Sequence, residues 1–181
     1  SSVNNGSDTY ASWSFRKAPG FFDVVTWTGN ETNRTISHSL GSTPGFIVVK
    51  RIDSTSNFTC YHRSIGATKY VSLNLTNAET TNSGIWNNTE PTSTAFTIGV
   101  NSRVNVNGGS FIAYVFAHDD QSFGTNEDEA IIKCGSFNSN SSGHYTVNLG
   151  FEPQFLLMKA TNSSGGWFQF DNMRGIAMDN V

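Results

Sequence analysis

Four histidines are the residues of this chain best suited to acid–base or metal chemistry. They are His38, His62, His118 and His144. None falls in a spacing such as H-x-x-x-H, which places two imidazoles on one metal ion. His38 lies in an alternating stretch, which favours a half-buried histidine with satisfied hydrogen bonds over a catalytic one. No G-x-S-x-G nucleophile elbow and no phosphate-binding glycine loop occurs. We therefore predict no catalytic residue, no metal ligand and no cofactor, and we expect that the chain is not an enzyme.

Cys60 and Cys134 are single and distant in the sequence, which is not a metal-binding pattern. Two buried, reduced thiols are the favoured interpretation, because an isolated cysteine behaves as a small apolar residue. A disulfide between the two is the alternative.

Carboxylates gather at 119–120 and again at 127–129, within a polar, glycine-containing stretch. Such oxygen clusters can hold calcium, but a solvated acidic linker is the favoured interpretation. A glycosidase would need its two carboxyl groups on facing strands, and these groups lie in a connection. The acidic stretch therefore predicts a linker between two structural units.

Aromatic residues offer the one candidate binding site. Trp86 lies at the centre of a long polar connection, 76–93, with Asn87 and Asn88 beside it. An exposed indole ring can stack on the C–H face of a sugar, and amides can bond to its hydroxyl groups. These three residues are the candidates for a glycan-binding loop. For Trp86 itself, the favoured interpretation is that the side chain folds back and closes one end of the core.

The composition favours a β protein and argues against two classes of partner. The 17 glycines and 13% aromatic residues suit short strands joined by polar turns. With a net charge of −3 and no basic run, nucleic acid is not an expected partner. No apolar run approaches the roughly 20 residues that a membrane span requires. Residues 1–10 lack the charged start and apolar middle of a signal peptide.

One stretch occurs twice, and the rest of the chain is arranged around it. Residues 41–63 (GSTPGFIVVKRIDSTSNFTCYHR) align without a gap to 150–172 (GFEPQFLLMKATNSSGGWFQFDN), so that equivalent positions are 109 residues apart. Phe46 matches Phe155, and Lys50 matches Lys159. A period of this length predicts a repeated β-module and not a solenoid of 20–50-residue units.

Apolar stretches of strand length predict β-structure throughout. They are 21–28, 35–40, 46–50, 58–62, 70–75, 95–100, 111–116, 131–137, 145–149, 155–159 and 167–171. The continuous runs 46–50 and 111–116 predict central strands covered on both faces. Alternation in 95–100 predicts that Phe96, Ile98 and Val100 are buried. No 3.6-residue period is sustained, so no helix beyond a turn or two is expected. The predicted fold is all-β, an antiparallel, jelly-roll-like β-sandwich with an internal repeat of about 109 residues.

The start of the chain matches the end of the repeated unit. Residues 7–16 (SDTYASWSFR) resemble 108–117 (GGSFIAYVFA), with aromatic residues at equivalent positions. These are Tyr10, Trp13 and Phe15 opposite Phe111, Tyr114 and Phe116. Residues 7–16 are therefore expected to form a strand.

The repeat predicts three parts. Residues 1–20 hold the last strand of a preceding unit, 21–125 form a complete β-sandwich unit, and 126–181 form the first half of a second, homologous unit. Apolar strands of a half-unit need a cover. Either they pack with 1–20 and the central unit as one domain, or a neighbouring chain completes them.

The order of these motifs resembles that of a known family. The runs that carry the resemblance are FFDVVTWTGN, TISHSLGSTPGFIVVK, YHRSIGATKYVSLNL, WNNTEPTSTAFTIGV, VNGGSFIAYVFAHD, CGSFNSN, VNLGFEPQFLLMK and FDNMRG. They are similar to the β-rich repeat modules in structural proteins of marine tailed phages, cyanophages especially. The resemblance covers nearly the whole chain and carries no catalytic motif.

The resemblance implies a virion structural protein of the tail-fibre, appendage or capsid-decoration kind. Its implied partners are other virion subunits, in a homo-oligomer that is trimeric by analogy, and a host surface glycan. Its implied location is the virion, assembled in the cytoplasm of a bacterial host. Two alternatives are open: a jelly-roll enzyme that degrades surface polysaccharide, and a purely structural filament protein with no ligand.

Overall fold

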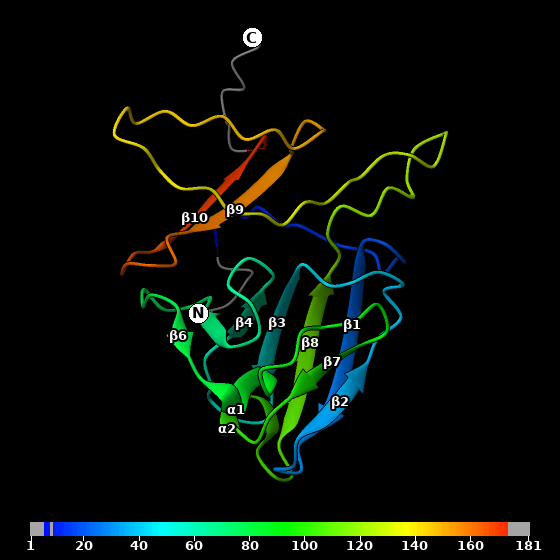
Figure 1. Ribbon diagram of the computed structural model, residues 1–181, viewed down its shortest axis with the longest axis vertical. Helices are drawn as coiled ribbons and strands as arrows, with labels where there is room; N and C mark the ends of the chain where they lie inside the picture. The colour runs from blue at the N-terminus through cyan, green and yellow to red at the C-terminus, as the bar shows by residue number, and fades with distance from the viewer. Residues whose placement is uncertain (1–5, 8, 174–181) are drawn as a thin grey trace.

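The computed structural model describes residues 6–7 and 9–173, and it is all-β with antiparallel sheets and two helices of a single turn. The elements are β1 (Phe22–Thr28), β2 (Arg34–Ser37), β3 (Phe46–Arg51), β4 (Thr59–His62), β5 (Lys69–Ser72), β6 (Thr80–Thr81), α1 (Ser83–Trp86), β7 (Ala95–Ile98), α2 (Ser102–Asn105), β8 (Ser110–Phe116), β9 (Phe155–Lys159) and β10 (Trp167–Asp171). Figure 1 shows a main body built from β1 to β8, with the β9–β10 hairpin at one end of it. Within the described residues, neither helix has the length to cross a membrane.

The main sheet has six strands in the order β1-β8-β3-β4-β5-β6. Strand β3 lies between β8 and β4, and it pairs Val49 with Ala113 on one edge and with Thr59 on the other. Strand β8 lies between β1 and β3. The prediction that 46–50 and 111–116 are central strands is therefore confirmed.

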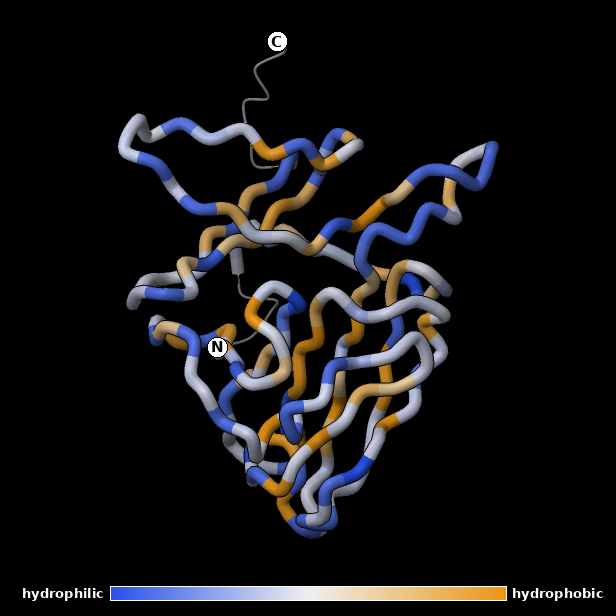
Figure 2. Tube along the Cα trace, viewed as in Figure 1, coloured by the Kyte–Doolittle hydropathy of each residue, from blue (hydrophilic) through white to orange (hydrophobic). Residues whose placement is uncertain are grey.

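A second layer covers one face of this sheet. It consists of the two-stranded ribbon β2–β7 and the helices α1 and α2 (Figure 1). Alternate residues of β8 point into the core between the layers, where they meet Phe96 and Ile98 of β7. Figure 2 shows apolar colouring on these strands and polar colouring on most of the loops. The antiparallel arrangement is consistent with the predicted β-sandwich.

Both helices begin at an asparagine cap. The side chain of Asn82 accepts a hydrogen bond from the Gly84 N–H (2.9 Å), and that of Asn101 accepts one from the Arg103 N–H (3.0 Å). Each cap satisfies a backbone donor that the first helical turn leaves free. Helix α1 ends at Asn87, whose φ of 51° is left-handed. The expectation of no helix beyond a turn or two is confirmed.

The prediction that Val100 is buried is wrong, because Val100 is 53% exposed. Strand β7 ends at Ile98, and the chain then turns against α1. The N–H of Gly99 donates to the Ile85 carbonyl (2.8 Å), and the N–H of Asn101 donates to the Gly84 carbonyl (2.9 Å). These two bonds hold the backbone on either side of Val100 against α1, so the strand alternation stops at Ile98 and the Val100 side chain is exposed.

Three predicted strands do not form. The described residues of the predicted strand 7–16, which are 7 and 9–16, have no strand assignment, and neither have 131–137 and 145–149. In the main body the equivalents of 131–137 and 145–149 pair with β8 and β7, respectively. Within the described residues, no strand equivalent to β8 pairs with 131–137, and none equivalent to β7 pairs with 145–149. Neither segment therefore has a partner with which to form a ladder of hydrogen bonds.

The second hairpin reproduces the first in register. Pairs Phe46↔His62 and Val49↔Thr59 join β3 to β4, and Phe155↔Asp171 and Met158↔Phe168 join β9 to β10. Each pair in the second hairpin therefore lies 109 residues after the equivalent pair in the first.

A lysine closes each hairpin in the same way. Lys50 Nζ donates to the Ser56 carbonyl (2.5 Å) and lies 5.3 Å from the ring centre of Phe58. Lys159 Nζ donates to the Gly165 carbonyl (2.6 Å) and lies 5.9 Å from the ring centre of Trp167. The two loops therefore share one side-chain brace.

A buried carboxylate ties the start of β1 to the loop after β2. Asp23 is almost fully buried, and it accepts from the N–H groups of Val24 (2.7 Å) and Ser39 (2.6 Å) and pairs with Lys17 Nζ (2.6 Å). Burial acts to raise the pKa of this carboxyl, but the hydrogen bonds and the Lys17 charge outweigh burial and hold the pKa below its ordinary value.

We predict that this carboxylate contributes to stability near neutral pH and less so in acid. Because its folded pKa is depressed, the contribution is present above pH 4 and is lost as pH falls through the folded pKa. Asp23→Asn should lower the free energy of unfolding at pH 7 by about 2 kcal/mol, with a deficit that narrows below pH 4. Urea unfolding across this pH range measures the effect. Asp53→Asn, which removes an exposed pairing with Arg51, is the control and should change stability little. A deficit that stays constant with pH would contradict the assignment.

Candidate functional site

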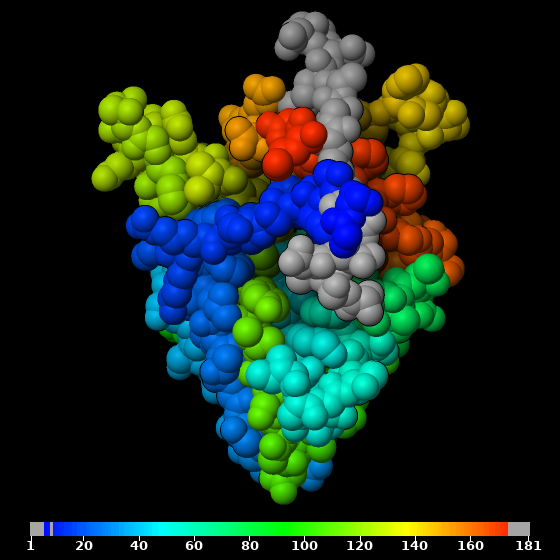
Figure 3. Space-filling view, turned by 180° about the vertical axis from the view of Figure 1, so that it is seen from behind, coloured from blue at the N-terminus to red at the C-terminus, as the bar shows by residue number. Residues whose placement is uncertain are grey.

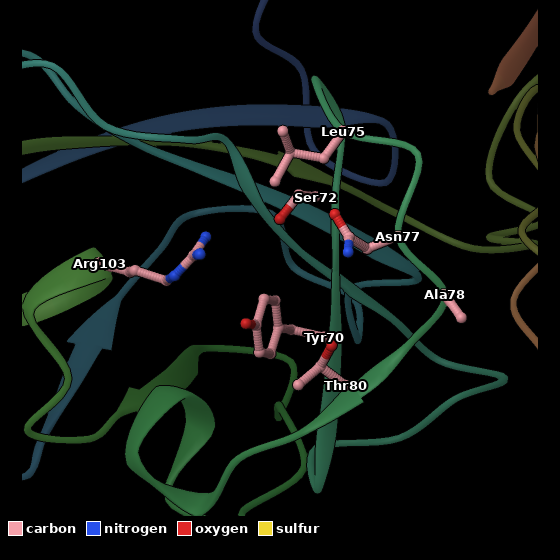
Figure 4. A pocket seen from close by; sticks show the side chains of 7 residues that line it. All are labelled: Tyr70, Ser72, Leu75, Asn77, Ala78, Thr80 and Arg103. Carbon is pink, nitrogen blue, oxygen red and sulfur yellow. The ribbon is translucent and has the colours of Figure 1, made fainter. Parts of the chain in front are cut away.

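A hollow of about 140 Å³ opens between β5, the loop that follows it, β6 and α2 (Figure 4). Its lining residues are Tyr70, Ser72, Leu75, Asn77, Ala78, Thr80 and Arg103. They supply an aromatic ring, three hydroxyl groups, a carboxamide and one cation. We call this site the Tyr70–Arg103 hollow.

Strand geometry explains how β5 contributes to the hollow. Tyr70 and Ser72 are two residues apart, so their side chains project from the same face of the strand. Strand β6 pairs with β5 through Tyr70↔Thr80, which brings the Thr80 side chain beside the ring. The Lys69–Glu79 ion pair joins the same two segments.

Helix α2 contributes the cation. Its cap at Asn101 fixes the start of the turn, and Val104 and Asn105 are buried beneath it. Asn105 anchors the turn further, because its side-chain amide donates to the carbonyls of Thr32 (2.7 Å) and Gly99 (2.9 Å). Arg103 therefore extends from a fixed base toward Tyr70, as Figure 4 shows.

The Arg103 guanidinium is held by the aromatic ring and retains a free donor. Its central carbon lies 5.4 Å from the ring centre of Tyr70, which is a cation–π contact. Its Nη1 atom is buried and has no hydrogen-bond partner among the described residues. A buried, unsatisfied donor costs free energy unless an acceptor reaches it.

The lining of the hollow offers several kinds of contact to a ligand. None of the seven lining residues is a histidine, cysteine, aspartate or glutamate. A guanidinium with a free N–H attracts a carboxylate or sulfate, while the ring, hydroxyls and amide suit a hydroxylated ring such as a sugar. The arrangement fits an anionic, hydroxyl-rich ligand.

Trp86 folds back into the core, as the favoured interpretation expected, and does not form an exposed platform. Its side chain is 2% exposed and packs edge-on against Tyr61, with ring centres 6.0 Å apart. Glu90 fixes the loop beyond it by accepting from the Tyr61 hydroxyl (2.6 Å) and the Ala67 N–H (2.7 Å). Trp86 closes the core instead of presenting a stacking face.

Asn87 and Asn88 remain at the surface, both with left-handed backbone, and Asn87 accepts from the Asn33 side chain (3.0 Å). Neither lines the Tyr70–Arg103 hollow. A binding role for these two asparagines stays a prediction.

The histidines do not assemble into a centre. The Nδ1 atom of His118 accepts from the backbone N–H of Cys134 (3.1 Å), and that of His38 accepts from the Leu40 N–H (3.3 Å). Burial lowers the pKa of His38, His62 and His118, and the Arg63 charge lowers it further for His62 and His118. Within the described ranges, no three His, Cys, Asp or Glu residues come close enough to hold a metal ion.

Neither the two cysteines nor the acidic stretch forms a binding site among the described residues. Cys60 and Cys134 are not joined to each other, and burial raises the pKa of each thiol to about 12. Asp119 pairs with Lys133 (3.3 Å), and Phe123 and Glu129 form an isolated bridge. The predicted acidic linker thus contains a small turn with local partners.

Sequence reasoning missed the Tyr70–Arg103 hollow because its parts lie in three separate segments. Arg103 lies in a connection and Tyr70 at the start of a strand, and neither position is distinctive alone. The long polar loop after β5 was the available signal, since a loop of this kind commonly carries function.

The model of a family described as Domain of unknown function (DUF7483) matches residues 1–180. No curated protein and no solved structure matches the chain.

We predict that Trp86 is a stability residue. Trp86→Ala should lower the free energy of unfolding by about 3–5 kcal/mol, because it empties a large buried volume between α1 and Tyr61. Trp86→Phe, which keeps most of that volume, is the matched control and should cost clearly less. Thermal unfolding followed by circular dichroism measures both. A Trp86→Ala protein as stable as the parent would contradict the burial of this ring.

Proposed function

The chain belongs to the DUF7483 family, and we propose that it is a β-rich scaffold module of a virion appendage, tail fibre or capsid decoration that binds an anionic surface glycan. The virion setting comes from the resemblance of its motifs to structural modules of marine tailed phages. The glycan class comes from the chemistry of the Tyr70–Arg103 hollow.

The observation that carries the scaffold role is the matched pair of hairpins. β3–β4 and β9–β10 share their register, their lysine brace and a closing bond, which runs from the Arg63 N–H to the Gly45 carbonyl (3.0 Å) and from the Asn172 N–H to the Gln154 carbonyl (3.2 Å). These features support an internal repeat of 109 residues. The jelly-roll wiring and the boundaries at 20 and 125 are part of the same proposal.

A repeated β-unit suits a load-bearing virion protein. Each unit adds a rigid sheet, and successive units extend the particle without a new fold. The second hairpin already packs on the first unit, because Trp167 contacts the cluster of Val48, Cys60 and Val71 on the outer face of the main sheet. Units that stack in this way give a stiff rod.

The glycan-binding role depends on Arg103. Its buried Nη1 donor beside Tyr70 would gain an acceptor from a uronate carboxylate or a sugar sulfate. The Ser72 and Thr80 hydroxyls and the Asn77 amide would bond to ring hydroxyls. The whole site lies at the rim of the main sheet, where β6 is the edge strand.

We predict that a uronic-acid oligosaccharide binds the chain and that a neutral dextran oligosaccharide does not. Arg103→Gln should weaken binding by roughly 10- to 100-fold, since it removes one charge-assisted hydrogen bond. Arg63→Gln is the control, because Arg63 is exposed and lies outside the hollow. Calorimetry measures the affinities. Equal loss in both variants, or no binding, would contradict the site, and release of cleaved sugar would indicate a degrading enzyme instead.

We also predict that removing each lysine brace affects only its own hairpin. Lys50→Met should lower the free energy of unfolding of the main body by about 1 kcal/mol, because β3 lies at the centre of the sheet. Lys159→Met should shift the Trp167 indole N–H resonance and leave the main thermal transition unchanged. Thermal unfolding and nitrogen-15 NMR measure these effects. If Lys159→Met left the Trp167 signal in place, the second brace would be absent and the repeat would lose its main support.

A further inference from the structure

Strand β9 has a partner on one edge only within the described residues, whereas its counterpart β3 has one on each edge. The second partner of β3 is β8, which pairs Phe116 with Phe46 and Tyr114 with Val48. An edge strand beside an apolar face is a template for another strand.

The hairpin β9–β10 also exposes the face that β3–β4 buries. Thr59 and Tyr61 of β4 are buried under the second layer, while the equivalent Phe168 and Phe170 of β10 are 57% and 39% exposed. Large exposed aromatic residues on one sheet face indicate an interaction surface.

The chain carries a second β8-like segment. Residues 10–16 match 111–117, and in the structure they belong to no strand. Tyr10 and Phe15 are 53% and 46% exposed. Seen from behind in Figure 3, the N-terminal segment crosses the molecule next to the second hairpin.

We infer that residues 10–16 of a second copy of this chain add as a strand along the free edge of β9, in the register that β8 has with β3. The expected pairs are Phe15 with Phe155, Trp13 with Leu157 and Ser12 with Met158. They correspond to Phe116↔Phe46, Tyr114↔Val48 and Ala113↔Val49. The inference rests on the repeat in the proposed function and continues the established β3–β8 interface into the second unit.

The segment of the same chain is held out of this register. Trp13 lies against Phe155, with ring centres 5.8 Å apart, which is two residues away from the β8-like pairing. Phe15 is fixed beside β1 and β8 by Phe21, Phe22 and Phe116, at ring distances of 5.7–5.9 Å. Moving Phe15 to the Phe155 of its own chain would break this cluster. The β9 edge of another copy can instead approach the segment where it lies, with Phe15 kept in its cluster.

This contact joins different surfaces of the two copies. One copy contributes its N-terminal segment and the other its β9 edge, so the association is head to tail and can continue. A chain of copies would then grow with each β9–β10 hairpin completed by the next molecule. Register is set by the aromatic residues, because a one-residue slip would turn them to the opposite face.

Paired cysteines test the register. Ser12→Cys and Met158→Cys are made separately in a Cys134→Ser background, then mixed and oxidised; Cys60 is fully buried and stays. Directly opposed residues in adjacent strands lie within disulfide range. Ser14→Cys mixed with Met158→Cys is the matched control, because it is on the same strand face but two residues away. The expected result is a two-chain disulfide product about tenfold above the control.

Sedimentation of the unmodified protein provides a second measurement. Its weight-average mass should rise with concentration, and a synthetic peptide of residues 7–17 should reverse the rise while a scrambled peptide does not. A concentration-independent monomer mass, or equal cross-linking in the control, would overturn the inference. So would a Ser12→Cys/Met158→Cys double variant that closes only within one chain. Uronate binding, and the shift of the Trp167 indole resonance in Lys159→Met, do not depend on this contact between copies. These two measurements therefore show whether a negative result overturns only this inference or the proposed function as well.

Discussion

The burial of strand β3 on both faces is the constraint on which the rest of the structure depends. Its inward residues Ile47 and Val49 are covered by the second layer, as in any two-layer β fold. Its outward residue Val48 also needs a cover, because an apolar side chain on a central strand is costly to leave in water. Cys60 and Val71 lie beside Val48 on the neighbouring strands, and Trp167 of the second hairpin packs against all three. The second hairpin is therefore part of what completes the first sheet.

The same contact positions the Tyr70–Arg103 hollow. The Trp167 indole N–H donates to the Ser72 carbonyl (2.9 Å), and the Gly165 N–H donates to the Thr76 carbonyl (2.8 Å). A third bond runs from the Glu79 N–H to the Thr161 carbonyl (2.7 Å). The loop that carries Asn77 and Ala78 is thus held against the second hairpin on both sides. Packing between the two hairpins and the shape of the binding site are physically coupled.

Much of the fold could be predicted from the sequence because its apolar patterns are local. The run 46–50 is continuous, so its central place and its burial follow from the pattern alone. The alternation of 70–75 marks a strand, but β5 ends at Ser72, and that polar residue is buried. Predictions were wrong where strand formation depended on whether a neighbouring strand was present to pair with. Residues 131–137 have the pattern of β1, yet no ladder forms there, and Val100 keeps the alternation of β7 but lies beyond its last paired residue.

The site was harder to predict for a related reason. Trp86 in a polar loop has the sequence of an exposed platform, but its neighbour Ile85 anchors α1 in the core and carries the indole inward. Arg103 and Tyr70 are 33 positions apart and meet only in the tertiary fold, where α2 packs against β3 and Arg103 reaches the Tyr70 ring. Loop composition indicates that a segment is polar, whereas tertiary contacts decide which of its side chains face a ligand.

One hairpin design occurs twice, and only the first copy is fully enclosed; hydrogen exchange across the whole chain at two protein concentrations tests this. Amides of β3 and β4 should be protected to the level of global unfolding at both concentrations. Amides of β9 and β10 should exchange much faster in dilute solution and gain protection as concentration rises. Equal protection of both hairpins in dilute solution, or fast exchange of β9 and β10 at every concentration, would contradict it.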